Sequence, residues 1–210
     1  AGKNYSWMKL RNGSLKDYVP NHYYLGYLLV NYGRGRYGPD FWTRVTRDAS
    51  AYRSLFYPFQ SAVKKHSGTD YKKFTSEALA SYRNSMGQQA VATGTSLLPV
   101  NKNYVTNYYF PYSAGEDSLV YLKTSYRERP AFYLKDKNGE HRIRYRDISI
   151  DEQFSYRNGK IVYAAYESDP RWGWKDYSVI RIIDLKTGEQ QSVKKNTKYF
   201  TPDISADGTK

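Results

Sequence analysis

Residues 168–177, SDPRWGWKDY, concentrate side chains that could bind a ligand. Trp172, Trp174 and Tyr177 stand beside Arg171 in this short stretch. Tryptophan rings on a loop can stack on a sugar ring or clamp a peptide, and neighbouring charges can fix the orientation of the ligand. The alternative is that these rings cover the apolar end of a sheet or pack against another domain. We therefore predict a ligand-binding site at these four residues, with the structural alternative open.

His22 is the second candidate binding residue. It falls in the first turn of a predicted helix that is rich in tyrosine. There it could face a cleft and help to hold a substrate, or it could be an ordinary polar residue at the start of a helix. The other two histidines, His66 and His141, are expected to be surface residues on a helix and a strand.

Several catalytic patterns do not occur in the sequence. No histidine precedes a glutamate or is followed four residues later by another histidine, so a His-Glu-x-x-His zinc site cannot be assembled from this chain. The chain has no cysteine and no Gly-x-Ser-x-Gly motif. Residues 33–38, GRGRYG, match a dinucleotide-binding pattern by letter, but a helix is predicted before them, where that pattern requires a strand. We expect no catalytic residue, metal or cofactor in this chain.

The net charge of +13 raises the question of a polyanionic partner. Lysine and arginine are spread along the whole chain, and the densest pattern is Arg142, Arg144 and Arg146. Spacing by two predicts that all three lie on one face of a strand. That face could follow a row of phosphates, or it could simply be solvated. Nucleic acid is not expected as the partner, and no apolar stretch is long enough to predict a membrane span.

Residues 1–98 are predicted to form a helical domain. Apolar residues recur at helical spacing in four segments, which is enough for the helices to share one core. The predicted start and stop signals, in chain order, are Pro20, Gly33 with Gly35, Asp40, Pro58 and Thr69.

From residue 99 onward the apolar periodicity changes from 3.6 to 2, which predicts antiparallel strands separated by glycine turns. The joint between the two halves is expected at residues 93–96, TGTS. The predicted fold class is α+β, with a helical domain at 1–98 and antiparallel four-stranded sheets at 99–210. The strand candidates are 108–112, 119–122, 131–134, 143–145, 160–164, 179–183 and 190–193.

The second half contains an internal repeat. SLVYL at 118–122 aligns with KIVYA at 160–164, and FSYRNGK at 154–160 aligns with ISADGTK at 204–210. These alignments predict two copies of one unit and the start of a third. A unit of about four short strands, repeating every forty-odd residues, is typical of a β-propeller blade.

ISADGTK, together with DLKTGE at 184–189, resembles the TolB-like propeller repeat of bacterial extracytoplasmic proteins. The first copy departs from it, with KDKNGE at 135–140. The resemblance implies a partial propeller over 99–210 and a periplasmic or other extracytoplasmic location, with a signal peptide upstream. Because the third copy stops after its turn, we expect a piece of a longer protein, with an open sheet edge that could support self-association.

Residues 17–45 resemble the helix pair that follows the third zinc ligand in gluzincin-type metallopeptidases. The similarity rests on an aromatic helix and the Y-G-x-D-F-W turn at 37–42. It implies that a parent protein could be a zinc peptidase whose metal ligands lie before Ala1.

Three functions follow as hypotheses. The first is a non-catalytic fragment of a larger extracytoplasmic protein that binds proteins, peptides or envelope polymers. The second is the C-terminal part of a zinc metallopeptidase. The third is a glycan or polyanion binder, for which binding should weaken as salt rises.

Overall fold

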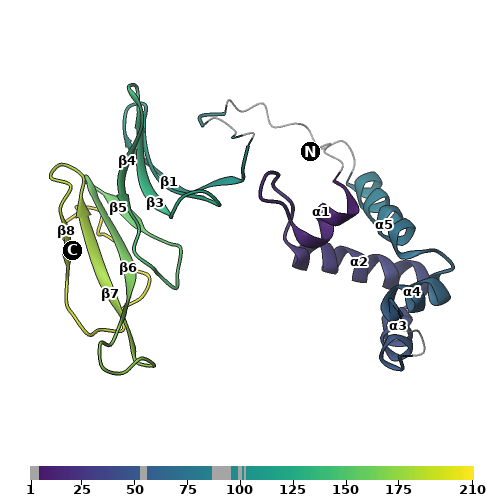
Figure 1. Cartoon of the computed structure of the whole chain (residues 1–210). Coiled ribbons are helices and arrows are strands. Elements are labelled where there is room, and N and C mark those ends of the chain that lie inside the picture. Colours follow the sequence, from purple (N-terminus) through teal and green to yellow (C-terminus); the bar gives the residue numbers. More distant parts are fainter. Residues whose placement is uncertain (1–4, 53–55, 87–95, 99–100, 102) are drawn as a thin grey trace. The chain divides into compact units, whose positions relative to one another are not determined.

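The computed structural model describes residues 5–52, 56–86, 96–98, 101 and 103–210, in two units, Ala1–Pro99 and Val100–Lys210. The first unit contains helices and the second contains strands (Figure 1). The predicted class, helices followed by antiparallel strands, is confirmed. Of the predicted joint at 93–96, residues 93–95 lie outside the described residues.

The helices of the first unit pack around one aromatic core. Phe41 and Phe74 are fully buried, with their rings stacked at 5.8 Å between centroids. Leu29 and Val63 add buried aliphatic side chains from two further helices. The described helices are α1 (Trp7–Asn12), α2 (His22–Tyr37), α3 (Phe41–Ser50), α4 (Pro58–Ser67) and α5 (Tyr71–Ser85).

Two predicted helix starts are wrong by one or two residues. α2 is capped by Asn21, whose side chain accepts the N–H of Tyr23 at 2.9 Å, and Pro20 lies outside the helix. α5 is capped by Asp70 instead of Thr69. In both cases a second residue with a good capping side chain stands next to the predicted start, and it takes the position.

The predicted stop at Gly33 and Gly35 is also wrong, because α2 runs through both and ends at Tyr37, with Gly38 as its C-cap. Gly33 serves close packing instead of termination. A Cβ atom there would lie 2.7 Å from Nε1 of Trp42, which donates to the carbonyl of Val30 at 2.8 Å. The missing side chain therefore lets α3 approach the backbone of α2.

The second unit consists of two four-stranded antiparallel sheets, each in simple meander order (Figure 1). We call β1–β4 the first sheet and β5–β8 the second sheet. The strands are β1 (Thr106–Gly115), β2 (Ser118–Ser125), β3 (Ala131–Asp136), β4 (Gly139–Tyr145), β5 (Ser155–Arg157), β6 (Lys160–Ser168), β7 (Asp176–Asp184) and β8 (Gln190–Ser192).

The aligned segments take equivalent places in the two sheets. SLVYL forms the start of β2 and KIVYA the start of β6, and each is the second strand of its sheet. Tyr121 and Tyr163 occupy the same position of the repeat, and both are fully buried. The strand β5, three residues long, was not among the strand candidates.

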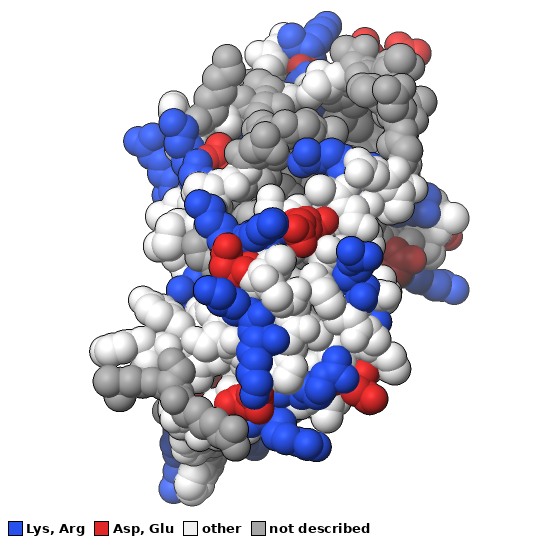
Figure 2. All heavy atoms as spheres, turned by 90° about the vertical axis from the view of Figure 1, so that its right-hand side faces the viewer, with Lys and Arg blue, Asp and Glu red and all other residues white. Residues whose placement is uncertain are grey.

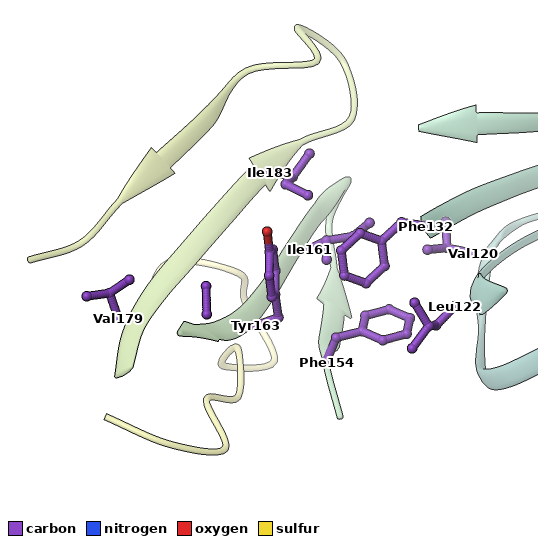
Figure 3. Close-up of a cluster of buried hydrophobic side chains, with 9 residues drawn as sticks. Val120, Leu122, Phe132, Phe154, Ile161, Tyr163, Val179 and Ile183 are labelled. Atoms are coloured by element: carbon purple, nitrogen blue, oxygen red, sulfur yellow. The ribbon is translucent and has the colours of Figure 1, made fainter. Parts of the chain in front are cut away.

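The two sheets pack on each other through one hydrophobic core (Figure 3). The ring centroid of Phe132 in the first sheet lies 5.0 Å from the ring centroid of Phe154 and 5.1 Å from that of Tyr163. Val120 and Leu122 lie on the same side of the first sheet. Each buried side chain of this size stabilises the fold by about 1.5–3 kcal/mol.

The prediction that Arg142, Arg144 and Arg146 share one face is wrong. The register of β4 shifts between its pairing with Tyr133 and with Phe132, so that Ile143 is an extra residue on β4. A bulge of this kind reverses the side on which the following residues project. Arg142 therefore pairs with Tyr133 on the side away from the core, while Arg144 pairs with Phe132 on the other side.

Arg146 is buried instead of solvated. Its guanidinium donates to the carbonyl of Glu152 at 3.0 Å and to that of Gln153 at 3.2 Å. It thereby holds the segment that joins the two sheets, which is a structural role and not one in phosphate binding.

Candidate ligand-binding site

The β6–β7 loop, residues 169–175, is ordered by one aspartate. The carboxylate of Asp169 accepts the N–H of Arg171 at 2.9 Å and that of Trp172 at 3.0 Å, and its second oxygen accepts the hydroxyl of Tyr177 at 2.8 Å. These donors, the Arg171 N–H first, hold the pKa of Asp169 below its usual value because they stabilise the carboxylate. The loop is therefore anchored at its base.

The two tryptophans project from this base into solvent. Trp174 is 100% exposed and Trp172 is 59% exposed. The guanidinium of Arg171 lies 5.3 Å from the ring of Trp172, a cation–π distance. Trp174 covers no part of its own sheet, so the alternative that it caps the end of the sheet does not apply to it.

Tyr177 differs from the other three predicted site residues. It is half-buried and packs against the core between the sheets, and its hydroxyl is used by Asp169. The structure therefore places Arg171 beside Trp172 at the surface and exposes Trp174 on the same loop, with Tyr177 as an anchor beneath the loop.

His22 lies in the first unit and is described within that unit alone. It is exposed at the first position of α2, with its ring 4.3 Å from that of Tyr23. Its environment is an exposed row of rings, which the sequence analysis did not single out: Tyr23, Tyr24 and Tyr27 are 75%, 71% and 69% exposed. Tyr27 is four residues after Tyr23 and three after Tyr24, a spacing that makes these side chains neighbours on a helix surface. The sequence therefore contained a usable signal for this row.

A second surface feature is a groove of about 410 Å³ on the side of the second sheet that faces away from the first. Val162, Ile180 and Ile182 form its apolar floor. Pro202 and Ile204 line it as well, and Ile204 is only 6% exposed.

Figure 2 shows lysine and arginine interleaved with acidic and uncharged residues over one face. Among the described residues there is no group of three or more histidine, aspartate or glutamate side chains that could hold a metal ion. None of the helices in the described part of the chain combines the length and apolar character that a bilayer span requires.

Comparison of the chain with family models, with curated proteins and with solved structures gives no match.

Proposed function

We propose that the chain is a binding module of a larger extracytoplasmic protein, and that the β6–β7 loop contacts a peptide or an envelope polymer. The observation that carries this proposal is the full exposure of Trp174 on an anchored loop. A large apolar ring that is exposed to water gives a favourable free energy when a sugar or peptide covers it, because apolar surface is removed from water.

The anchoring of the loop supports the same proposal. Asp169 fixes the backbone at Arg171 and Trp172 before any ligand arrives. Because that ordering is already present in the free protein, it does not have to be supplied at the moment of binding. The Tyr177 hydroxyl, bound to the second oxygen of Asp169, ties this anchor to β7.

We further propose that the two sheets are consecutive blades of a TolB-like propeller. The equivalence of Tyr121 and Tyr163 supports this, because both project toward the same side of their own sheets. Val120 of the first sheet is covered by the second sheet, while Val162, its equivalent, lines the open groove. A third sheet that packed on Val162 would repeat the first interface.

The loop proposal is tested by a fluorescence titration with peptidoglycan fragments, which carry both sugar and peptide. Chitohexaose and a free stem peptide serve as separate arms that identify which part binds. We expect quenching of tryptophan emission by the fragments and about a tenfold loss of affinity in Trp174→Ala, equal to about 1.4 kcal/mol.

Tyr126→Ala is the matched control, because Tyr126 is an aromatic side chain in another loop and is 67% exposed. It should bind as the unmodified chain does. Equal binding by Trp174→Ala and the unmodified chain, or no binding in any arm, would refute the role of this loop.

A further inference from the structure

The first sheet has a face that carries one tyrosine from each strand. Tyr108, Tyr121, Tyr133 and Tyr145 come from β1 to β4 in order, and all lie on the side away from the core between the sheets. We call this the tyrosine face. It belongs to neither the β6–β7 loop nor the groove of the second sheet.

At the centre of the tyrosine face, the charged side chains are paired with each other. Glu140 accepts the hydroxyl of Tyr121 on one carboxylate oxygen and the ammonium of Lys123 on the other. The ammonium also lies 4.7 Å from the centroid of the Tyr133 ring. Lys123 and Glu140 therefore neutralise each other, and the centre offers no unpaired charge to a ligand.

The margin of the face is different. The guanidinium carbons of Arg129 and Arg142 lie 5.5 Å and 4.2 Å from the centroid of one ring, that of Tyr145. Arg142 also donates to the Tyr145 hydroxyl at 2.7 Å. Both arginines are exposed, and in the part of the chain that the structure describes neither forms an ion pair with a carboxylate.

The bulge at Ile143 creates this arrangement. In a regular strand, residues three apart project to opposite sides. With the extra residue, Arg142 and Tyr145 project to the same side, and Arg129 reaches the same ring from the β2–β3 loop. Bulges that re-aim a side chain in this way are common next to binding sites.

Two guanidinium groups held at one ring repel each other, and an oxyanion between them would relieve that repulsion. Arginine is suited to the role, because its planar fork can stack on a ring and still present N–H groups to an anion. We propose that Arg129, Arg142 and Tyr145 form a binding site for a sulfate or carboxylate group of an acidic glycan. Tyr145 is 37% exposed, so the part of its ring that the arginines leave open can contact the sugar.

The surroundings favour an acidic glycan over nucleic acid. Glu128 directly precedes Arg129 and accepts the Tyr133 hydroxyl at 3.3 Å, and Glu140 lies farther along the same face. A continuous row of phosphates would meet these carboxylates, whereas a single anionic group reaches only the two arginines. The site goes beyond the proposed function, since it uses no residue of the β6–β7 loop.

The test is isothermal titration of the intact chain with a heparin hexasaccharide, with its desulfated, carboxylate-bearing counterpart, and with a DNA duplex. We expect Arg129→Gln and Arg142→Gln each to weaken binding of an acidic hexasaccharide by about tenfold, or about 1.4 kcal/mol. The matched control is Arg144→Gln, which removes the same charge from the same strand on the opposite face and should change affinity by less than about twofold. Tyr145→Phe keeps the ring and should retain most of the affinity.

Three results would overturn the proposal. Equal losses in Arg142→Gln and Arg144→Gln would show a general effect of net charge. Binding to neither hexasaccharide would remove the site, and tighter binding of the duplex through the same arginines would reassign it to nucleic acid. Trp174→Ala should leave binding of the acidic hexasaccharide unchanged, so failure here and failure of the loop proposal are separately visible.

Discussion

Tyr121 of the first sheet and Tyr163 of the second hold the same position of the repeat, yet their surroundings differ. Tyr163 is covered by the first sheet, and its hydroxyl reaches Asp147 at 3.2 Å and Gln190 at 3.1 Å. Tyr121 is covered by side chains of its own sheet, with the Tyr108 ring at 5.6 Å. One repeat position can thus be buried by a neighbouring sheet or by local aromatic and charged side chains.

We expect the largest difference between the two positions when each tyrosine is replaced by alanine and the free energy of unfolding is measured. Tyr163→Ala should lower the free energy of unfolding by about 3–5 kcal/mol, because a cavity between two sheets cannot easily collapse. Tyr121→Ala should cost less, about 2 kcal/mol, because no second sheet packs on the tyrosine face in the described structure, so neighbouring side chains can relax into part of the space. Urea unfolding followed by circular dichroism measures both, and equal costs would contradict the comparison.

High pH probes the two hydroxyls. Burial, followed by Glu140 for Tyr121 and Asp147 for Tyr163, raises the pKa of both phenols above the usual value near 10. The folded state therefore holds these protons more tightly than the unfolded state. Their contribution to stability is complete below pH 10 and is lost as the pH rises above 10.

We accordingly expect urea midpoints to fall between pH 10 and pH 11, and to fall less steeply in Tyr163→Phe and in Tyr121→Phe. Absorbance at 295 nm should show the buried phenols ionising only as the chain unfolds. An unchanged pH slope in both variants would mean that other tyrosines cause the alkaline loss.

The smallest expected effect concerns the groove of the second sheet. Ile182→Gln should change stability by less than about 1 kcal/mol, since the side chain is only partly buried. It should reduce the fluorescence of the apolar dye ANS, which we expect to occupy the groove. Leu119→Gln on the tyrosine face, also half-buried, is the matched control and should leave dye binding unchanged.

Much of the fold followed from apolar spacing, because burial imposes period 3.6 on helices and period 2 on strands. The repeat alignment also placed Tyr121 and Tyr163 at equivalent positions. Three features did not follow. Gly33 is a residue type that often ends helices, but here it allows close contact between α2 and α3. Ile143 lies in a bulge that only the pairing of β4 with β3 reveals. The strand β5 is too short to show a period in the sequence.

The candidate site was predicted in part. Arg171, Trp172 and Trp174 could be chosen from residue type and loop position, because the sequence concentrates two tryptophans and a cation in one short connection. The anchoring role of Tyr177 depends on a hydrogen bond to Asp169 across eight residues, which spacing alone does not indicate. The arginine pair at Tyr145 depends on the bulge and was likewise beyond the sequence.

The turn at Gly208 rests directly on the earlier turn at Asn158. The Asn158 amide donates to the Asp207 carbonyl at 2.9 Å, and a Cβ atom on Gly208 would lie 2.7 Å from that amide nitrogen. The later turn therefore packs on a turn that precedes it by about fifty residues in the chain. When this turn emerges from the ribosome during N-to-C synthesis, its packing partner at Asn158 has already been made.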